Sequence, residues 1–282
     1  MLVAVAACGT SKDNKTAGGE GGGTIEVVAS INQWGSVAKD LGGSHVDVTN
    51  IMTKTNVEAH DYEPPAGRAK FGTAKVAVVN GADYDPLGVQ GASATKATLV
   101  TAAETAGIKE GDNPHVWFSA KVRNNTADAI TAAYQKADPS HKDDYAKLNK
   151  EWHAKEDQLE SKIKDASAKT KDVPYAATES VAWYLADDLG MKDATPTGYA
   201  QASANESEPT PSDIKAFQDA LKGGSIKMLV FNTQEANSTT DQITGAAKSA
   251  NVPIVELTEQ MPKEYTNLLD WMSALVDQFA KA

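Results

Sequence analysis

Cysteine and positive charge are both scarce in this sequence. Its 282 residues include one cysteine, Cys8, and 27 Lys and Arg residues against 38 Asp and Glu residues, a formal net charge of −11. A single thiol cannot close an intramolecular disulfide or form a cysteine-rich metal site. Nucleic acid and anionic lipid carry the same sign as most of this surface. We therefore expect no binding to nucleic acid, and a surface that attracts cations.

Long hydrophobic runs and common catalytic motifs are also missing. No apolar stretch after Cys8 approaches the ~20 residues that a helix needs to span a bilayer. The sequence contains no G-x-G-x-x-G, G-x-x-x-x-G-K-[ST], G-x-S-x-G or H-E-x-x-H motif. These absences remove the usual signatures of dinucleotide binding, P-loop nucleotide binding, serine hydrolases and zinc proteases.

The N-terminus combines a short apolar run with an abrupt change to polar residues at Cys8. This pattern resembles the lipobox of bacterial lipoproteins, which implies that residues 1–8 are a signal remnant and that lipidated Cys8 anchors the chain to the outer face of the cell membrane. The basic n-region of a signal peptide is absent, so a disordered N-terminus with an incidental thiol is the alternative. Residues 9–24 are rich in glycine and polar residues, which predicts a flexible tether.

The rest of the chain alternates between strand and helix patterns. Short apolar segments rich in β-branched residues predict strands at 25–29, 46–52, 75–79, 98–101, 173–177, 226–231 and 253–257. Helical patterns lie between them, including 180–189, 211–221, 239–250 and 265–279. Because strands alternate with helices, we expect an α/β fold with mainly parallel sheets.

One segment predicts a single long helix. No proline or glycine occurs between Pro139 and Pro174, and apolar residues recur there at steps of three, four and seven: Tyr145, Leu148, Trp152, Leu159, Ile163 and Ala166. This spacing predicts a helix of about 30 residues, about 45 Å long, with one buried stripe. A coiled coil is the alternative, but α/β segments on both sides favour a packed connecting helix.

We therefore predict two Rossmann-like α/β lobes joined by this helix. The N-terminal lobe covers residues 25–138, the connecting helix 139–171 and the C-terminal lobe 172–282.

Two of the five histidines lie in loops that follow predicted strands. In an open α/β sheet such loops line the binding crevice, and a neutral imidazole is a common metal ligand. For His60 and His115, the residues alone leave open a choice between a metal ligand and a loop hydrogen-bonding group. Structural roles are expected for His45, His141 and His153.

Several short motifs that occur in a fixed order favour one of these two roles for His60 and His115. They are His60-Asp61-Tyr62-Glu63-Pro64, residues 76–85, Asn113-Pro114-His115-Val116-Trp117, Thr178-Glu179-Ser180, residues 208–213 and Phe231-Asn232-Thr233-Gln234. Together they resemble the zinc- and manganese-binding lipoproteins of bacterial ABC importers, from about residue 25 to the C-terminus. The resemblance implies a rigid helix between two lobes and a metal held in the cleft between them.

The resemblance also implies metal ligands at matching positions. The first two ligand histidines fall on His60 and His115, and the third position falls on Glu179, which could also cap a helix N-terminus. The fourth position, a carboxylate after a strand of the second lobe, departs from the family pattern. Asp241 is our choice there, although it could be an ordinary first-turn acid of the following helix. Its rivals are Glu58, Glu206, Glu235 and the carbonyl of Asn237.

These ligands define a function. Two imidazoles and one or two carboxylates suit Zn²⁺ and are tolerated by Mn²⁺, so the ion is Mn or Zn. Glutamate at position 179 and the absence of a histidine-rich loop at residues 93–111 favour manganese. The resemblance implies a monomeric, extracytoplasmic binding protein that delivers the ion to an ABC permease and its ATPase, and not an enzyme. The alternatives are a metal-dependent hydrolase that uses the same cluster and a surface adhesion lipoprotein.

Overall fold

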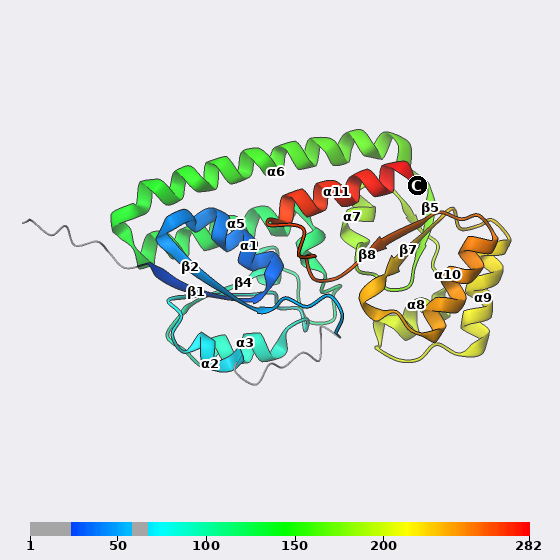
Figure 1. The fold of residues 1–282 in the computed structure, drawn as a ribbon, viewed down its shortest axis with the longest axis horizontal. Coiled ribbons are helices and arrows are strands. Elements are labelled where there is room, and N and C mark those ends of the chain that lie inside the picture. The colour runs from blue at the N-terminus through cyan, green and yellow to red at the C-terminus, as the bar shows by residue number, and fades with distance from the viewer. Residues whose placement is uncertain (1–23, 58–66) are drawn as a thin grey trace, which may run out of the picture.

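The computed structural model describes residues 24–57 and 67–282 (Figure 1). The predicted signal remnant with Cys8 lies outside the described residues, as does nearly all of the predicted tether. The described chain forms two α/β lobes with parallel sheets, joined by one long helix. The predicted fold class is therefore confirmed.

The N-terminal lobe is built on a parallel sheet with strand order β2-β1-β3-β4. Its strands are β1 (Ile25–Ile31), β2 (Val46–Met52), β3 (Val76–Val79) and β4 (Thr98–Thr101). Its helices are α1 (Asn32–Gly42), α2 (Gly67–Phe71), α3 (Pro86–Ser93), α4 (Ala102–Thr105) and α5 (Ala120–Ala137). Figure 1 shows α1 and α5 on one face of the sheet and α2 and α3 on the other.

Both faces of this sheet are covered because its central strands are apolar on both sides. Along β3, Val76 and Val78 pack into the large core beneath α1 and α5. Ala77 and Val79 pack with Phe71 in a smaller cluster beneath α2 and α3. A parallel sheet that buries both faces reads as a continuous apolar run, as this strand does.

The C-terminal lobe repeats this plan with strand order β6-β5-β7-β8. Its strands are β5 (Pro174–Ala177), β6 (Lys192–Asp193), β7 (Met228–Asn232) and β8 (Ile254–Leu257). Its helices are α7 (Trp183–Asp188), α8 (Thr197–Ala204), α9 (Pro211–Lys222) and α10 (Ser238–Ser249). Phe217 of α9 and Ile243 of α10 pack with Leu229 of β7 in a cluster of their own.

Two helices span the lobes along one side of the molecule. The connecting helix α6 (Lys142–Thr170) follows a short turn, η3 (Pro139–His141), and the C-terminal helix α11 (Leu268–Lys281) packs along it (Figure 1). Lys162 of α6 donates hydrogen bonds to the backbone and side chain of Ser273 on α11 and pairs with Asp277 at 2.8 Å. The two helices therefore pack against each other, and both contact elements of both lobes.

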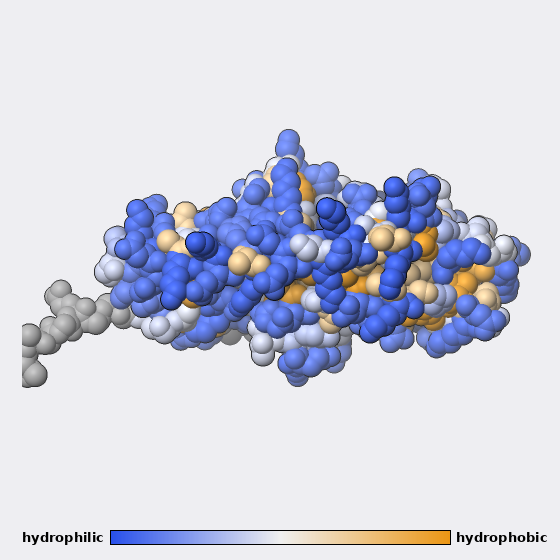
Figure 2. All heavy atoms as spheres, turned by 90° about the horizontal axis from the view of Figure 1, so that it is seen from above, coloured by the Kyte–Doolittle hydropathy of each residue, from blue (hydrophilic) through white to orange (hydrophobic). Residues whose placement is uncertain are grey.

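The face that carries α6 is mainly hydrophilic, with apolar residues scattered over it (Figure 2). This agrees with the charged residues that the sequence places around the apolar stripe of α6. Within residues 24–57 and 67–282, the helices are too short or too polar to cross a lipid bilayer.

Candidate metal centre

His115 is fixed in one tautomer by its neighbour Asn113. The amide nitrogen of Asn113 donates to the carbonyl oxygen and hydroxyl of Ser180, at 2.9 and 3.0 Å, so its Oδ1 is left as the acceptor. That oxygen lies 3.0 Å from both the backbone nitrogen and Nδ1 of His115. Nδ1 therefore carries the proton, and the lone pair of Nε2 points the other way, as a metal-binding imidazole requires.

Nε2 of the imidazole faces two carboxylates of the C-terminal lobe. Nε2 of His115 lies 3.3 Å from Oε1 of Glu179 and 3.8 Å from Oε2 of Glu259. Glu179 follows β5 and Glu259 follows β8, so both come from the carboxyl edge of one parallel sheet. One potential ligand atom from each of the three residues lies within 4.8 Å of the others. The cluster thus joins the two lobes at one point.

Burial makes this cluster favourable for a cation. The exposed fractions of the side chains are 3% for His115, 13% for Glu179 and 0% for Glu259. Burial, followed by the nearby Glu179 carboxylate, raises the pKa of Glu259 to about 7, while His115 and hydrogen bonds act in the opposite direction. The two adjacent carboxylates repel each other when both are ionised, so a divalent cation between them would offset that repulsion.

Hydrogen bonds hold both carboxylates in place. Nδ2 of Asn232, the last residue of β7, donates to Oε2 of Glu179 at 2.6 Å and to Oε1 of Glu259 at 3.0 Å. The hydroxyl of Tyr84 donates to Oε2 of Glu259 at 2.8 Å. Such partners orient metal ligands and are expected around a preformed site.

The structure brings two of the four predicted ligands together and leaves one apart. His115 and Glu179 meet in the cluster, whereas His60 and the rival Glu58 lie outside the described residues. Asp241 does not belong to the cluster: it is exposed in the first turn of α10, where its backbone nitrogen donates to the carbonyl of Asn237.

Glu259 is the acidic residue that the sequence interpretation missed. The sequence pattern places the fourth carboxylate after β7, but β7 ends at Asn232, whose side chain donates hydrogen bonds to both glutamates. A usable signal was present, because Glu259 comes two residues after the predicted strand 253–257. The loop after each parallel strand reaches the same edge of the sheet.

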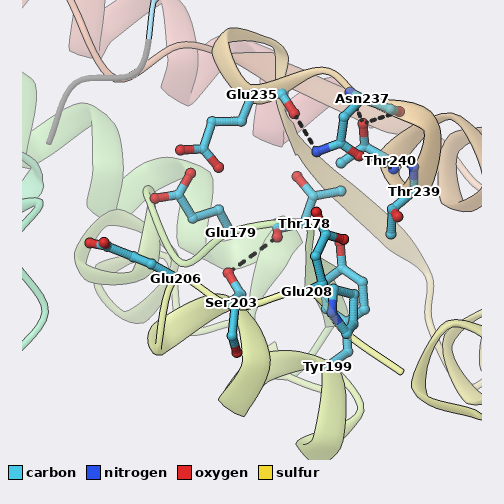
Figure 3. A pocket seen from close by; sticks show the side chains of 12 residues that line it. Thr178, Glu179, Tyr199, Ser203, Glu206, Glu208, Glu235, Asn237, Thr239 and Thr240 are labelled. Carbon is cyan, nitrogen blue, oxygen red and sulfur yellow. Dashed lines mark hydrogen bonds between the residues drawn. The ribbon is translucent and has the colours of Figure 1, made fainter. Parts of the chain in front are cut away.

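The other rivals for the fourth position line a pocket beside Glu179. This pocket has a volume of about 320 Å³, and Glu206, Glu208, Glu235 and Asn237 are among its lining residues. Figure 3 shows the carboxylates of Glu179, Glu206 and Glu235 on the same side of it. The surroundings of the cluster are therefore acidic and would concentrate cations.

Comparisons with known proteins agree with this geometry. A family model described as "ZnuA: Zinc-uptake complex component A periplasmic" matches residues 27–282. The high-affinity zinc uptake system protein ZnuA of Bacillus subtilis is 24% identical over 283 residues, covering 92% of this chain and 86% of that protein. The manganese-binding lipoprotein MntA of the same organism is 25% identical over 258 residues, covering 87% and 81%.

A solved structure has the same fold. The periplasmic zinc-binding protein TroA of Treponema pallidum superposes with a TM-score of 0.78 at 15% identity, covering 92% of this chain and 99% of that one. The two chains therefore share their fold although their sequences are only 15% identical.

Proposed function

Because this chain belongs to the ZnuA family of zinc-uptake components, we propose that it captures Zn²⁺ or Mn²⁺ outside the cytoplasm and delivers the ion to an ABC permease. Family membership confirms the resemblance that the sequence motifs indicated. The relatives include a zinc-uptake protein and a manganese-binding protein, so both ions are candidates. Their names describe zinc uptake and manganese binding and no catalysed reaction, so we set the hydrolase alternative aside.

The convergence of His115, Glu179 and Glu259 carries this proposal. These three groups supply one nitrogen and at least two oxygen ligands, buried and drawn from both lobes. Mixed nitrogen and oxygen sets of this kind bind Zn²⁺ at ~2.0 to 2.2 Å and also accept Mn²⁺. We propose His60, which the sequence motif indicates, as a fourth ligand, and Glu259 in place of Asp241.

Family membership also supports proposals about the partners and the location of this chain. Extracytoplasmic binding proteins of importers work with a permease and its ATPase subunit, and we propose these as the partners. MntA is named a lipoprotein, which supports lipidation of Cys8 as the anchor of this chain. We also propose that the protein works as a monomer, since its ligands come from two lobes of one chain.

Metal titration of the full chain tests the proposal. After removal of bound metal with a chelator, calorimetry should show one Zn²⁺ or Mn²⁺ per chain, and Glu259→Gln should weaken binding strongly. Glu256→Gln, which removes an exposed charge three residues away on β8, is the matched control and should bind like the wild type.

The outcomes separate the competing assignments. Failure of the wild-type chain to bind either ion would overturn the function. Loss of binding in Asp241→Asn, with Glu259→Gln unaffected, would show that Asp241, and not Glu259, supplies the second carboxylate.

A further inference from the structure

Tyr84 reaches from the N-terminal lobe into the metal centre. It lies in the turn between β3 and α3, where the carboxylate of Asp85 accepts hydrogen bonds from the backbone nitrogens of Asn80 and Gly81 at 2.7 and 2.8 Å. Tyr84 is 1% exposed, and its ring packs edge-on against His115 and Trp117, with centroid distances of 5.8 and 4.9 Å. The turn and the aromatic neighbours thus fix the place of its hydroxyl.

A chain of amides fixes the direction in which this hydroxyl donates. Gln234 Nε2 donates to Oε1 of Gln260 at 2.7 Å, so the other end of the Gln260 amide is the donor. That nitrogen donates to the Tyr84 oxygen at 2.8 Å. The proton of Tyr84 is consequently directed to Oε2 of Glu259, 2.8 Å away.

Both oxygens of Glu259 are therefore held. Asn232 donates to Oε1 from within the C-terminal lobe, and Tyr84 donates to Oε2 from the opposite lobe. With a hydrogen bond on each oxygen and no exposed surface, the carboxylate has one orientation. A freely rotating carboxylate could offer a cation either one oxygen or both, whereas this one is restricted.

We propose that Tyr84 is a positioning and specificity-determining residue that holds Glu259 in an orientation favouring Zn²⁺ over Mn²⁺. The inference rests on the proposed function. Zn²⁺ is satisfied by four ligands at short distances, and a rigid set with one contact per residue suits it. Mn²⁺ prefers a larger, oxygen-rich shell, which a carboxylate free to rotate supplies better.

The test compares Tyr84→Phe with the wild type in the full chain. Each metal-free protein is titrated with Zn²⁺ and with Mn²⁺ in competition with a chromophoric chelator. We expect Zn²⁺ affinity to fall about 10- to 100-fold, the usual effect of losing a group that orients a metal ligand, and Mn²⁺ affinity to fall less. The preference for Zn²⁺ over Mn²⁺ should therefore decrease. Co²⁺ in the zinc site should also lose visible absorption intensity as its coordination number rises.

Tyr134→Phe is the matched control. Tyr134 is another buried tyrosine of the N-terminal lobe, 0% exposed, and its hydroxyl donates to the backbone oxygen of Ala38 at 2.9 Å, away from the cluster. Both variants lose one buried hydroxyl, so a general loss of stability affects both. The change in metal preference should appear in Tyr84→Phe alone.

Each remaining outcome decides the proposal. An unchanged ratio of the two affinities in Tyr84→Phe, or an equal change in Tyr134→Phe, would overturn it. If Tyr84→Phe does not fold, Gln260→Met, which removes the donor to the Tyr84 oxygen, should shift the ratio in the same direction by a smaller factor, and no shift there would overturn the proposal. A wild-type chain that binds neither ion contradicts the proposed function itself.

Discussion

At the scale of single residues, the protonation state of Asp85 affects the stability of the fold. Its carboxylate closes the turn that carries Tyr84 by accepting from two backbone nitrogens. Burial raises its pKa from 3.8 to about 6, although the nearby Ser30 hydroxyl and the hydrogen bonds from the backbone act in the opposite direction. The folded state therefore holds this proton more tightly than the unfolded chain does. Stability from Asp85 is greatest below about pH 4 and is lost as the pH rises through about 6.

Asp85→Asn tests this linkage. The free energy of unfolding of the wild type, relative to that of Asp85→Asn, should fall by up to about 3 kcal/mol between about pH 4 and pH 6 and stay constant above. Urea denaturation at half-unit pH intervals measures it, and the backbone acceptor lost in the variant adds only a constant offset. Asp83→Asn, in the same turn but exposed, keeps Asp85 and should retain the pH profile of the wild type. Parallel profiles for wild type and Asp85→Asn would contradict the assignment.

Two of the three residues in the cluster could be predicted from the sequence. His115 and Glu179 were identifiable because each lies in a short motif with recognisable neighbours, and the cluster includes both. Glu259 was missed because its neighbours carry no motif. Its role arises from the position of β8 beside β7 and from contacts with Tyr84, 175 residues earlier in the chain. Such contacts depend on tertiary packing, and the sequence indicates only that Glu259 lies two residues after the predicted strand 253–257.

At the scale of elements, α6 is fastened to the loop that carries His115. Arg123 of α5 and Glu156 of α6 form an ion pair at 2.6 Å in which both side chains are 0% exposed. Nη1 of the same arginine donates to the backbone oxygens of Trp117 and Phe118, at 3.1 and 2.9 Å. The pair therefore links the connecting helix to the segment directly after His115.

Breaking this pair from one side should be costly. Glu156→Gln leaves the Arg123 charge buried without its counter-ion, and we expect a loss of about 3–5 kcal/mol in the free energy of unfolding, measured with urea. Glu151→Gln is the control on the same helix. Glu151 makes an exposed pair with Lys147 at 3.9 Å, and its loss should cost about 0.5 kcal/mol or less.

Replacing both buried charges should cost less than removing one. In Arg123→Met with Glu156→Met, no uncompensated charge remains, so the double variant should be more stable than Glu156→Gln. Equal, small losses for Glu156→Gln and Glu151→Gln would show that the buried pair does not hold α6 in place.

Elements also differ in how far the sequence predicts them. The long helix was predictable because Trp152, Leu159 and Ile163 repeat at helical spacing, and all three are buried. The helix expected at 265–279 begins later, at Leu268, because the Asn267 side chain accepts from the backbone nitrogen of Asp270. Strand β6 had no signal, since its two residues are exposed and make only a short edge pairing. Strand order in both sheets is set by packing between segments.

At the scale of the whole molecule, the chain crosses back from the second lobe to the first beside the metal centre. Gln33 of α1 donates to the backbone oxygen of Glu259 at 2.7 Å. Asn32 donates to the backbone oxygen of Met261 and accepts from its nitrogen, at 2.7 and 3.1 Å. These bonds are buried and join segments more than 200 residues apart. One large apolar core also contains strand residues of both sheets.

This continuity predicts that the two lobes unfold together. Calorimetry of the metal-free chain should show one transition whose calorimetric and van't Hoff enthalpies agree, because the shared core and α11 leave neither lobe with a complete interior of its own. Zn²⁺ at about a hundredfold excess over its Kd should move the entire transition upward, by about 2.7 kcal/mol of added stability, since the proposed site combines groups of both lobes and forms only in the folded chain. Two separate transitions, of which only one responds to metal, would contradict the prediction. They would mean that the lobes unfold independently and that the buried hydrogen bonds of Asn32 and Gln33 do not couple them.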